Sequence, residues 1–204
     1  MSVAALFYYA YAYLPRQMYK WQRRSLQAFA RAMELRSGGR FGDSKKIARM
    51  AVEVAEALRL SPKRRRQLEL AVYLRDIGMA AVPYFILNAE RPLSTMEQLT
   101  LDRHVEIGAS MVEQIPNLQS LKRLVLLHHA RYDRHPKIML EAHILSALSS
   151  FFEIAWSHGL DRAVLALKQG AGTLYHPRVA AAIIDHLPTA GGAAIDATGN
   201  VQAS

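Results

Sequence analysis

Apolar residues recur three and four positions apart along most of the chain, and alternating apolar and polar runs are nearly absent. This spacing gathers the apolar side chains on one face of a helix and predicts an all-α fold. In the turn RSGGRFGDS at 36–44, the glycines end one helix and Asp43 or Ser44 can cap the next. Helices are expected at residues 22–35, 45–60, 62–78, 94–114, 118–130, 140–157, 161–168 and 177–187.

Local signals support the ends of several of these helices. Ser61 can cap the third helix, with Pro62 at its first position, where a missing N–H is tolerated. Ser94 and Glu97 have the spacing of a capping box. Two prolines and an asparagine between residues 82 and 92 predict a loop.

A length of 204 residues with 51% hydrophobic and 21% charged residues is typical of one folded globular domain. The sequence contains no cysteine, so a metal ion would have to be held by His, Asp or Glu. This also fits a reducing, cytoplasmic location. We expect an N-terminal helix at 1–24, a main helical domain at 25–188 and a flexible tail at 189–204.

The first residues form an apolar, aromatic segment. Ser2 to Leu14 carry no charge, and a basic stretch begins at Arg16. The segment is too short to cross a bilayer alone, and no basic residue precedes it as in a signal peptide. We expect it to pack on the domain or on a second copy, giving a homodimer. The alternatives are a membrane-contacting anchor and the remnant of a spanning helix in a longer protein.

The formal net charge of +9 is concentrated near the N-terminus, because residues 16–66 carry 15 basic and only 4 acidic residues. Such a surface could meet nucleic acid, anionic lipid or an acidic partner. The sequence has no zinc finger or RNP-type motif, so a solvated basic face is favoured and DNA binding is not expected.

The stretch AVYLRDIGMA places Arg75 and Asp76 inside an apolar helix. Arg75 shares a helical face with Leu68 and Val72, which predicts that it is buried or lines a cleft. A buried guanidinium requires a partner. Asp76 points about 100° away around the helix, so the two need not pair with each other.

Histidines on two other predicted helices suggest metal chemistry. His104 lies on an apolar face with Gly108, which would let another segment approach closely, and His128 and His129 end the next helix. Each alone is more simply a core or surface histidine. Together with Asp76 they form a nitrogen and oxygen donor set suited to a first-row transition metal.

The order and spacing of RDIG, LDRHVEIG and HHARYD, with the helices around them, resemble the HD-GYP family of the HD superfamily over about residues 26–187. This family comprises bacterial phosphodiesterases that act on cyclic di-GMP. The resemblance implies an HD-superfamily bundle of five to seven helices. It also implies a centre of two or three metal ions, usually iron or manganese, that generates a hydroxide.

The resemblance implies that one metal position is kept and its neighbour is lost. The ligands of the kept position correspond to Asp76, His104, His128 and His129, and would hold one ion of Fe, Mn, Zn or Ni.

At the lost position, the family's two histidines and one aspartate are replaced by Arg75, Asp43 and Ser149. Met79 stands where the family has a lysine. The GYP segment is also shortened, to Arg-His-Pro at 134–136.

Two interpretations of Arg75 stay open. In the first, its guanidinium occupies the vacated metal position and pairs with Asp76 or Asp43. In the second, no metal binds, and these residues form a buried ion pair with water and the histidines.

We therefore expect a catalytically degenerate HD-GYP-like domain that signals by binding a cyclic dinucleotide or a protein. Arg131, Arg134 and Lys137 are the candidates for phosphate contacts. The alternatives are a phosphodiesterase or phosphohydrolase that uses one remaining metal, and a structural module for oligomerisation.

Overall fold

The structure is a computed structural model that describes residues 2–37 and 43–187. Within these ranges every regular element is a helix, apart from one isolated bridge between Ala171 and Tyr175. The expected all-α fold is therefore confirmed. The elements are α1 Val3–Tyr8, the π-helix η1 Tyr9–Tyr13, α2 Leu14–Arg36, α3 Ser44–Ala57, α4 Pro62–Leu74, the 3₁₀ helix η2 Ile77–Ala81, α5 Tyr84–Leu87, α6 Thr95–Asp102, α7 His104–Glu113, the 3₁₀ helix η3 Gln119–Leu121, α8 Lys122–Leu126, α9 Leu140–His158, α10 Leu160–Gly170 and α11 Pro177–Asp185.

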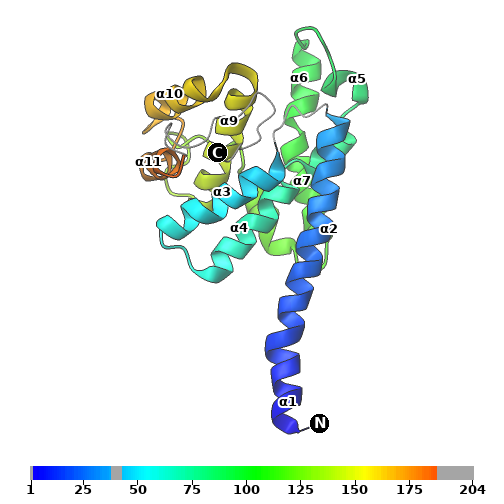
Figure 1. The fold of residues 1–204 in the computed structure, drawn as a ribbon. Helices are drawn as coiled ribbons and strands as arrows, with labels where there is room; N and C mark the ends of the chain where they lie inside the picture. The colour runs from blue at the N-terminus through cyan, green and yellow to red at the C-terminus, as the bar shows by residue number, and fades with distance from the viewer. Residues whose placement is uncertain (1, 38–42, 188–204) are drawn as a thin grey trace, which may run out of the picture.

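The expected N-terminal helix is present and continues into α2, so that α1, η1 and α2 follow one another without a break. Figure 1 shows its first turns projecting away from the other helices. The expected domain boundary near residue 24 falls inside α2, and the expected tail at 189–204 lies outside the described residues. None of the described helices combines the length and apolar character needed to cross a bilayer.

Helix α2 is fixed to α4 through a carboxylate that is partly buried. Tyr19 and Arg23 both donate to Glu69, whose side chain is only 12% exposed. One turn further on, Gln27 donates to the hydroxyl of Tyr73 at 2.8 Å. A buried carboxylate is costly unless donors surround it, and these contacts supply the donors.

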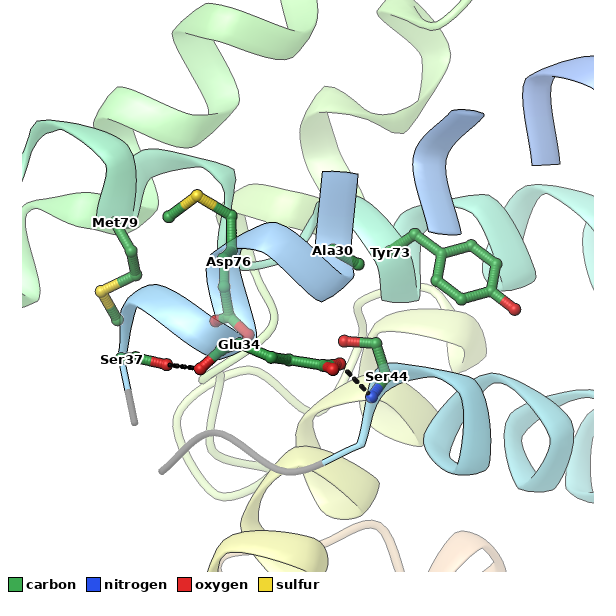
Figure 2. Close-up of a pocket in the computed structure, with 8 residues that line it drawn as sticks. Ala30, Glu34, Ser37, Ser44, Tyr73, Asp76 and Met79 are labelled. Atoms are coloured by element: carbon green, nitrogen blue, oxygen red, sulfur yellow. Dashed lines mark hydrogen bonds between the residues drawn. The ribbon is translucent and has the colours of Figure 1, made fainter. Parts of the chain in front are cut away.

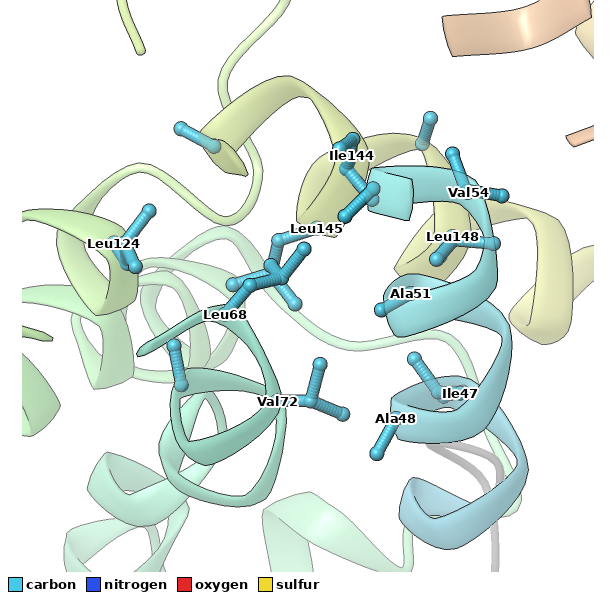
Figure 3. Close-up of a cluster of buried hydrophobic side chains, with 14 of the residues drawn as sticks. Ile47, Ala48, Ala51, Val54, Leu68, Val72, Leu124, Ile144, Leu145 and Leu148 are labelled. Carbon is cyan, nitrogen blue, oxygen red and sulfur yellow. The ribbon is translucent and has the colours of Figure 1, made fainter. Parts of the chain in front are cut away.

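The main core lies where α3, α4 and α9 meet. Their apolar residues are spaced three and four apart, so each helix turns one apolar face toward the other two. Figure 3 shows these faces packed together. The side chains at the contact include Ile47, Ala51 and Val54 of α3, Leu68 and Val72 of α4, and Ile144, Leu145 and Leu148 of α9.

Several expected helix limits were wrong. The helix expected at 62–78 ends at Leu74, and the loop expected at 82–92 contains the short helix α5. The helix expected at 94–114 is divided at Arg103 into α6 and α7. The helix expected at 118–130 is regular α-helix only over residues 122–126.

Two histidine side chains give a physical reason for the break at Arg103 and for the end of α8 at Leu126. The ring of His104 hydrogen-bonds the carbonyl of Leu101, and the ring of His128 hydrogen-bonds the carbonyl of Val125. In an uninterrupted helix each carbonyl would accept from the backbone N–H four residues later. A side chain that takes this acceptor competes with continuation of the helix.

Candidate functional site

The site is assembled by a close approach of two glycines, Gly78 of η2 and Gly108 of α7. A Cβ atom added to Gly78 would lie 1.9 Å from the carbonyl oxygen of His104 and 2.7 Å from the backbone nitrogen of Gly108. Only glycine fits at such a contact. The close approach expected at Gly108 is confirmed, and it sets the Arg75–Asp76 turn beside the start of α7.

Three imidazoles come together at this point. His104 is the first residue of α7, and His128 and His129 lie in the turn that follows α8. One ligand atom from each of the three lies within 4.8 Å of those of the other two. His104 and His128 are buried, whereas His129 is exposed. We call this group the histidine triad.

Hydrogen bonds fix which ring nitrogen carries the proton in two of the three histidines. Nδ1 of His104 lies 2.7 Å from the carbonyl of Leu101, and Nδ1 of His128 lies 2.6 Å from the carbonyl of Val125. A carbonyl can only accept, so each Nδ1 carries the hydrogen and each Nε2 presents a lone pair in the neutral ring. Histidines that bind metals are commonly oriented in this way.

The two Nε2 atoms of His104 and His128 are 3.3 Å apart, so two acceptors face each other. A proton on one ring or a shared metal ion would relieve this arrangement. Burial, and next the neighbouring imidazole of His129, hold the pKa of His128 well below its ordinary value. The donor set therefore fits a metal ion that prefers imidazole nitrogen.

Arg75 and Asp76 form an ion pair beside the triad. Arg75 is buried, as expected, and its Nε lies 2.8 Å from Oδ2 of Asp76. The expectation that the two need not pair assumed a continuous helix. Because α4 ends at Leu74, the pair lies in a turn and the helical separation does not apply. The other oxygen of Asp76, Oδ1, lies 3.7 Å from Nε2 of His128.

Asp43 has the capping role that was one of its two expected roles, the other being a partner of Arg75. It caps α3, accepting from the backbone nitrogens of Lys45 at 2.9 Å and Lys46 at 3.3 Å. Its side chain is 45% exposed. Of the two partners considered for Arg75, the structure gives Asp76.

The remaining replaced positions are buried and uncharged. Met79 lies in η2 with its side chain buried. Ser149 lies on α9, and within the described ranges its buried Oγ has no hydrogen-bond partner.

Glu34 is a residue of this region that the sequence analysis missed. It is a buried acid on α2 whose Oε1 accepts from the backbone nitrogen of Ser44 at 2.6 Å. It lines a small pocket together with Asp76, and Figure 2 shows its side chain extending from α2 toward the start of α3. The available signal was its spacing of four from Ala30, which puts an acid on an apolar face.

The three candidate phosphate-binding residues lie in the segment after His129, and all are exposed. Arg131 is engaged with Asp133 through two bonds, Nε to Oδ1 at 3.1 Å and an Nη atom to Oδ2 at 2.6 Å. This pairing lowers the pKa of Asp133. Phosphate contacts by Arg131, Arg134 and Lys137 stay a prediction.

Comparison with known proteins places this site in a family. The HD domain family matches residues 27–179, which include the turn with Asp76 and all three histidines. The chain is 31% identical over 181 residues to the cyclic di-GMP phosphodiesterase response regulator RpfG of Xanthomonas campestris pv. campestris (strain 8004), covering 80% of this chain and 47% of that protein. The chain thus spans about half the length of this curated relative. These findings confirm the HD-GYP-like resemblance of the motifs, and the chain belongs to the HD domain family.

Proposed function

We propose that this chain is a catalytically degenerate HD-GYP-like domain that binds one divalent transition-metal ion and acts in signalling by binding a ligand rather than by hydrolysing it. The observation that carries this proposal is the buried guanidinium of Arg75, 2.8 Å from the carboxylate of Asp76 and beside the histidine triad. It places a fixed organic cation next to a donor set suited to a metal.

The histidine triad would hold the ion, with Asp76 beside it. The hydrogen bonds of Nδ1 to the carbonyls of Leu101 and Val125 leave Nε2 as the lone-pair nitrogen of His104 and His128 in their neutral form, and these two Nε2 atoms face each other. When bound, the metal supplies Lewis-acid polarisation of a phosphate oxygen. Its positive charge, together with that of Arg75, favours a ligand with negative charge.

We attribute the loss of hydrolysis to the residues that stand at the second, lost metal position. Phosphodiester cleavage by paired metals uses two ions about 3.5 to 4 Å apart to stabilise the attacking and leaving oxygens. At the second position Arg75 is a cation that cannot activate water by coordination, Ser149 offers no carboxylate, and Asp43 is used as a helix cap. Arg75 keeps some charge stabilisation without providing a second metal-bound nucleophile.

The ligand we propose is a cyclic dinucleotide, because the relative named above is a cyclic di-GMP phosphodiesterase. Exposed basic residues after His129 offer contacts for its phosphates, and Arg134 is the best placed to test this, since Arg131 is held by Asp133.

Calorimetry with cyclic di-GMP and Mn²⁺, combined with a turnover assay under the same conditions, tests the proposal. We expect saturable binding without linearised product, and weaker binding by Arg134→Gln than by the matched exposed control Arg162→Gln. Absence of binding would remove the nucleotide from the proposal.

Product formation that depends on the histidine triad would instead support a second candidate, a phosphodiesterase with one metal. The convergence of three imidazoles is the observation in favour of that candidate.

A further inference from the structure

The N-terminal helix presents an apolar surface that the rest of the chain leaves uncovered. Every residue from Ser2 to Tyr11 is exposed, and no charged residue occurs before Arg16. The exposed fractions reach 60% for Phe7 and 77% for Tyr11. We call residues Val3–Leu14 the apolar rod.

Apolar side chains surround the rod instead of forming a stripe. Successive helical residues point about 100° apart, so Leu6, Phe7 and Tyr8 face three different directions. A helix that is hydrophobic all round is typically buried in the core of a large protein or in lipid. A helix that packs against a single partner typically has one apolar face and one polar face.

The rod stands clear of the body of the protein. Contacts that fix α2 to α4 begin at Tyr19 and Arg23, and Figure 1 shows the helix before them projecting outward. At 1.5 Å per residue the rod is roughly 18 Å long. One leaflet of a bilayer has a hydrocarbon layer of about 15 Å, half of the full apolar thickness. The rod therefore matches one leaflet.

Basic residues follow directly where the rod ends. Arg16, Lys20 and Arg24 are spaced by four, so they share one face of α2, and all three are exposed. No ion pair involves them among the residues that the structure describes. We call these three residues the basic stripe. The exposed Tyr13 precedes the stripe and the exposed Trp21 lies between Lys20 and Arg24, and such aromatic rings favour the interface between lipid and water.

We propose that the apolar rod inserts into one leaflet of an anionic lipid bilayer while the basic stripe contacts the headgroup phosphates. Neither the rod nor the stripe lies within residues 27–179, which the HD domain family covers. The proposal is independent of the metal site. It goes beyond the proposed function by giving the domain a membrane surface as a partner.

A second copy of the chain fits this surface less well. A paired helix would cover one side of the rod and leave the other side in water. In a parallel pair, the basic stripes would also lie beside one another and repel. Lipid covers all sides at once, and anionic headgroups complement the stripe.

Co-sedimentation of the full chain with vesicles of phosphatidylcholine, with and without phosphatidylglycerol, tests the proposal. Binding should require the anionic lipid and should weaken with added salt. Phe7→Asp with Tyr11→Asp should reduce vesicle affinity at least about tenfold, because charge in the hydrocarbon region is strongly disfavoured. These positions are exposed, so the fold should persist, as circular dichroism would verify.

Neutralising the basic stripe with Arg16→Gln, Lys20→Gln and Arg24→Gln should reduce affinity about fivefold for each charge removed. The matched control Arg162→Gln, Lys168→Gln and Arg178→Gln removes the same charge from exposed positions on the body and should bind normally. Equal losses in both triple variants would mean that net charge, and not the stripe, drives binding, and would overturn the proposal.

A spectroscopic measurement locates the contact. In Trp156→Phe the remaining tryptophan is Trp21, whose emission should shift to shorter wavelength on adding anionic vesicles. No binding to anionic vesicles, or an unchanged spectrum at saturation, would overturn the insertion. So would sedimentation showing a stable dimer that Phe7→Asp dissociates, because the second copy would then be the occupant.

Discussion

Nε2 of His104 lies 3.3 Å from Nε2 of His128, and the opposite nitrogen of each ring is hydrogen-bonded to a backbone carbonyl. In the neutral rings, two buried lone pairs therefore point at each other. Burial lowers the pKa of His128 and so disfavours a proton on that ring, and a metal ion is a cation that suits both lone pairs. The carboxylate of Asp76 is close by but shared with Arg75.

Removal of one triad member should abolish tight metal binding. Loss of groups that merely orient a metal ligand costs about 10- to 100-fold in affinity, so loss of a ligand in His128→Ala should cost at least that much. Competition with a fluorescent chelator measures it. His158→Ala, at an exposed histidine on α9, is the control and should leave affinity unchanged. Equal affinities of the two variants would rule out the triad as the site.

Replacing the buried cation should strengthen metal binding. Arg75→Met removes a positive charge that repels the ion and frees Oδ2 of Asp76, so the metal dissociation constant should fall about tenfold or more. Arg75→Lys keeps the charge and should give no such gain. The same titration applies to both variants, and a weaker affinity in Arg75→Met would contradict the repulsion that we infer.

The sequence predicted the buried faces of the main helices, because a spacing of three and four is a local property. It placed Arg75 and Asp76 wrongly in a helix, because the contact of Gly78 with the carbonyl of His104 joins segments distant in sequence. No periodicity within one segment reports such a contact.

That glycine contact makes a sharp prediction about stability. Gly78→Ala would set a Cβ 1.9 Å from a backbone oxygen of His104, which cannot swing away as a side chain could. We expect a loss of about 3 kcal/mol or more in the free energy of unfolding, at the upper end of overpacking effects. Urea denaturation measures it, with the exposed neighbour in Ala80→Ser as control. A loss similar to that of the control would mean that the two segments are not in contact.

The free energy of unfolding should fall in mild acid because of a second group of aromatic residues, which surrounds His143. Burial, and next the neighbouring His176, lower the pKa of His143. Tyr132 packs against both rings, and the charge of His135 also acts on His143.

The folded state therefore binds a proton at His143 less readily than the unfolded state, whose pKa is about 6.5. The stabilisation is fully present above that pH. It is lost as the pH falls toward the lowered folded-state pKa, with a slope of up to about 1.4 kcal/mol per pH unit for this residue. Denaturation of chelator-treated protein across this range should show a shallower slope for His143→Gln than for the exposed control His158→Gln. Identical slopes would contradict the burial of a neutral ring.

In the candidate site, too, the sequence predicted some of the residues and missed others. His104, His128 and His129 were found because ordered motifs carry them, and the structure brings them together. Glu34 was missed because no role was assigned to the glutamate of the segment LQAFARAMELRS, although an acid on an apolar face was a signal. The sequence allowed either Asp43 or Ser44 to cap α3. Backbone geometry decides between them, and in the structure the cap is Asp43.

The central claim is that a built-in guanidinium replaces one metal ion beside a site that still binds another. Elemental analysis of metal per chain, on protein purified without chelator, tests it most directly. We predict one ion per chain, and more than one after restoring Arg75→His, Ser149→Asp and Asp43→His together. Two ions on the unaltered chain, or none, would contradict the account.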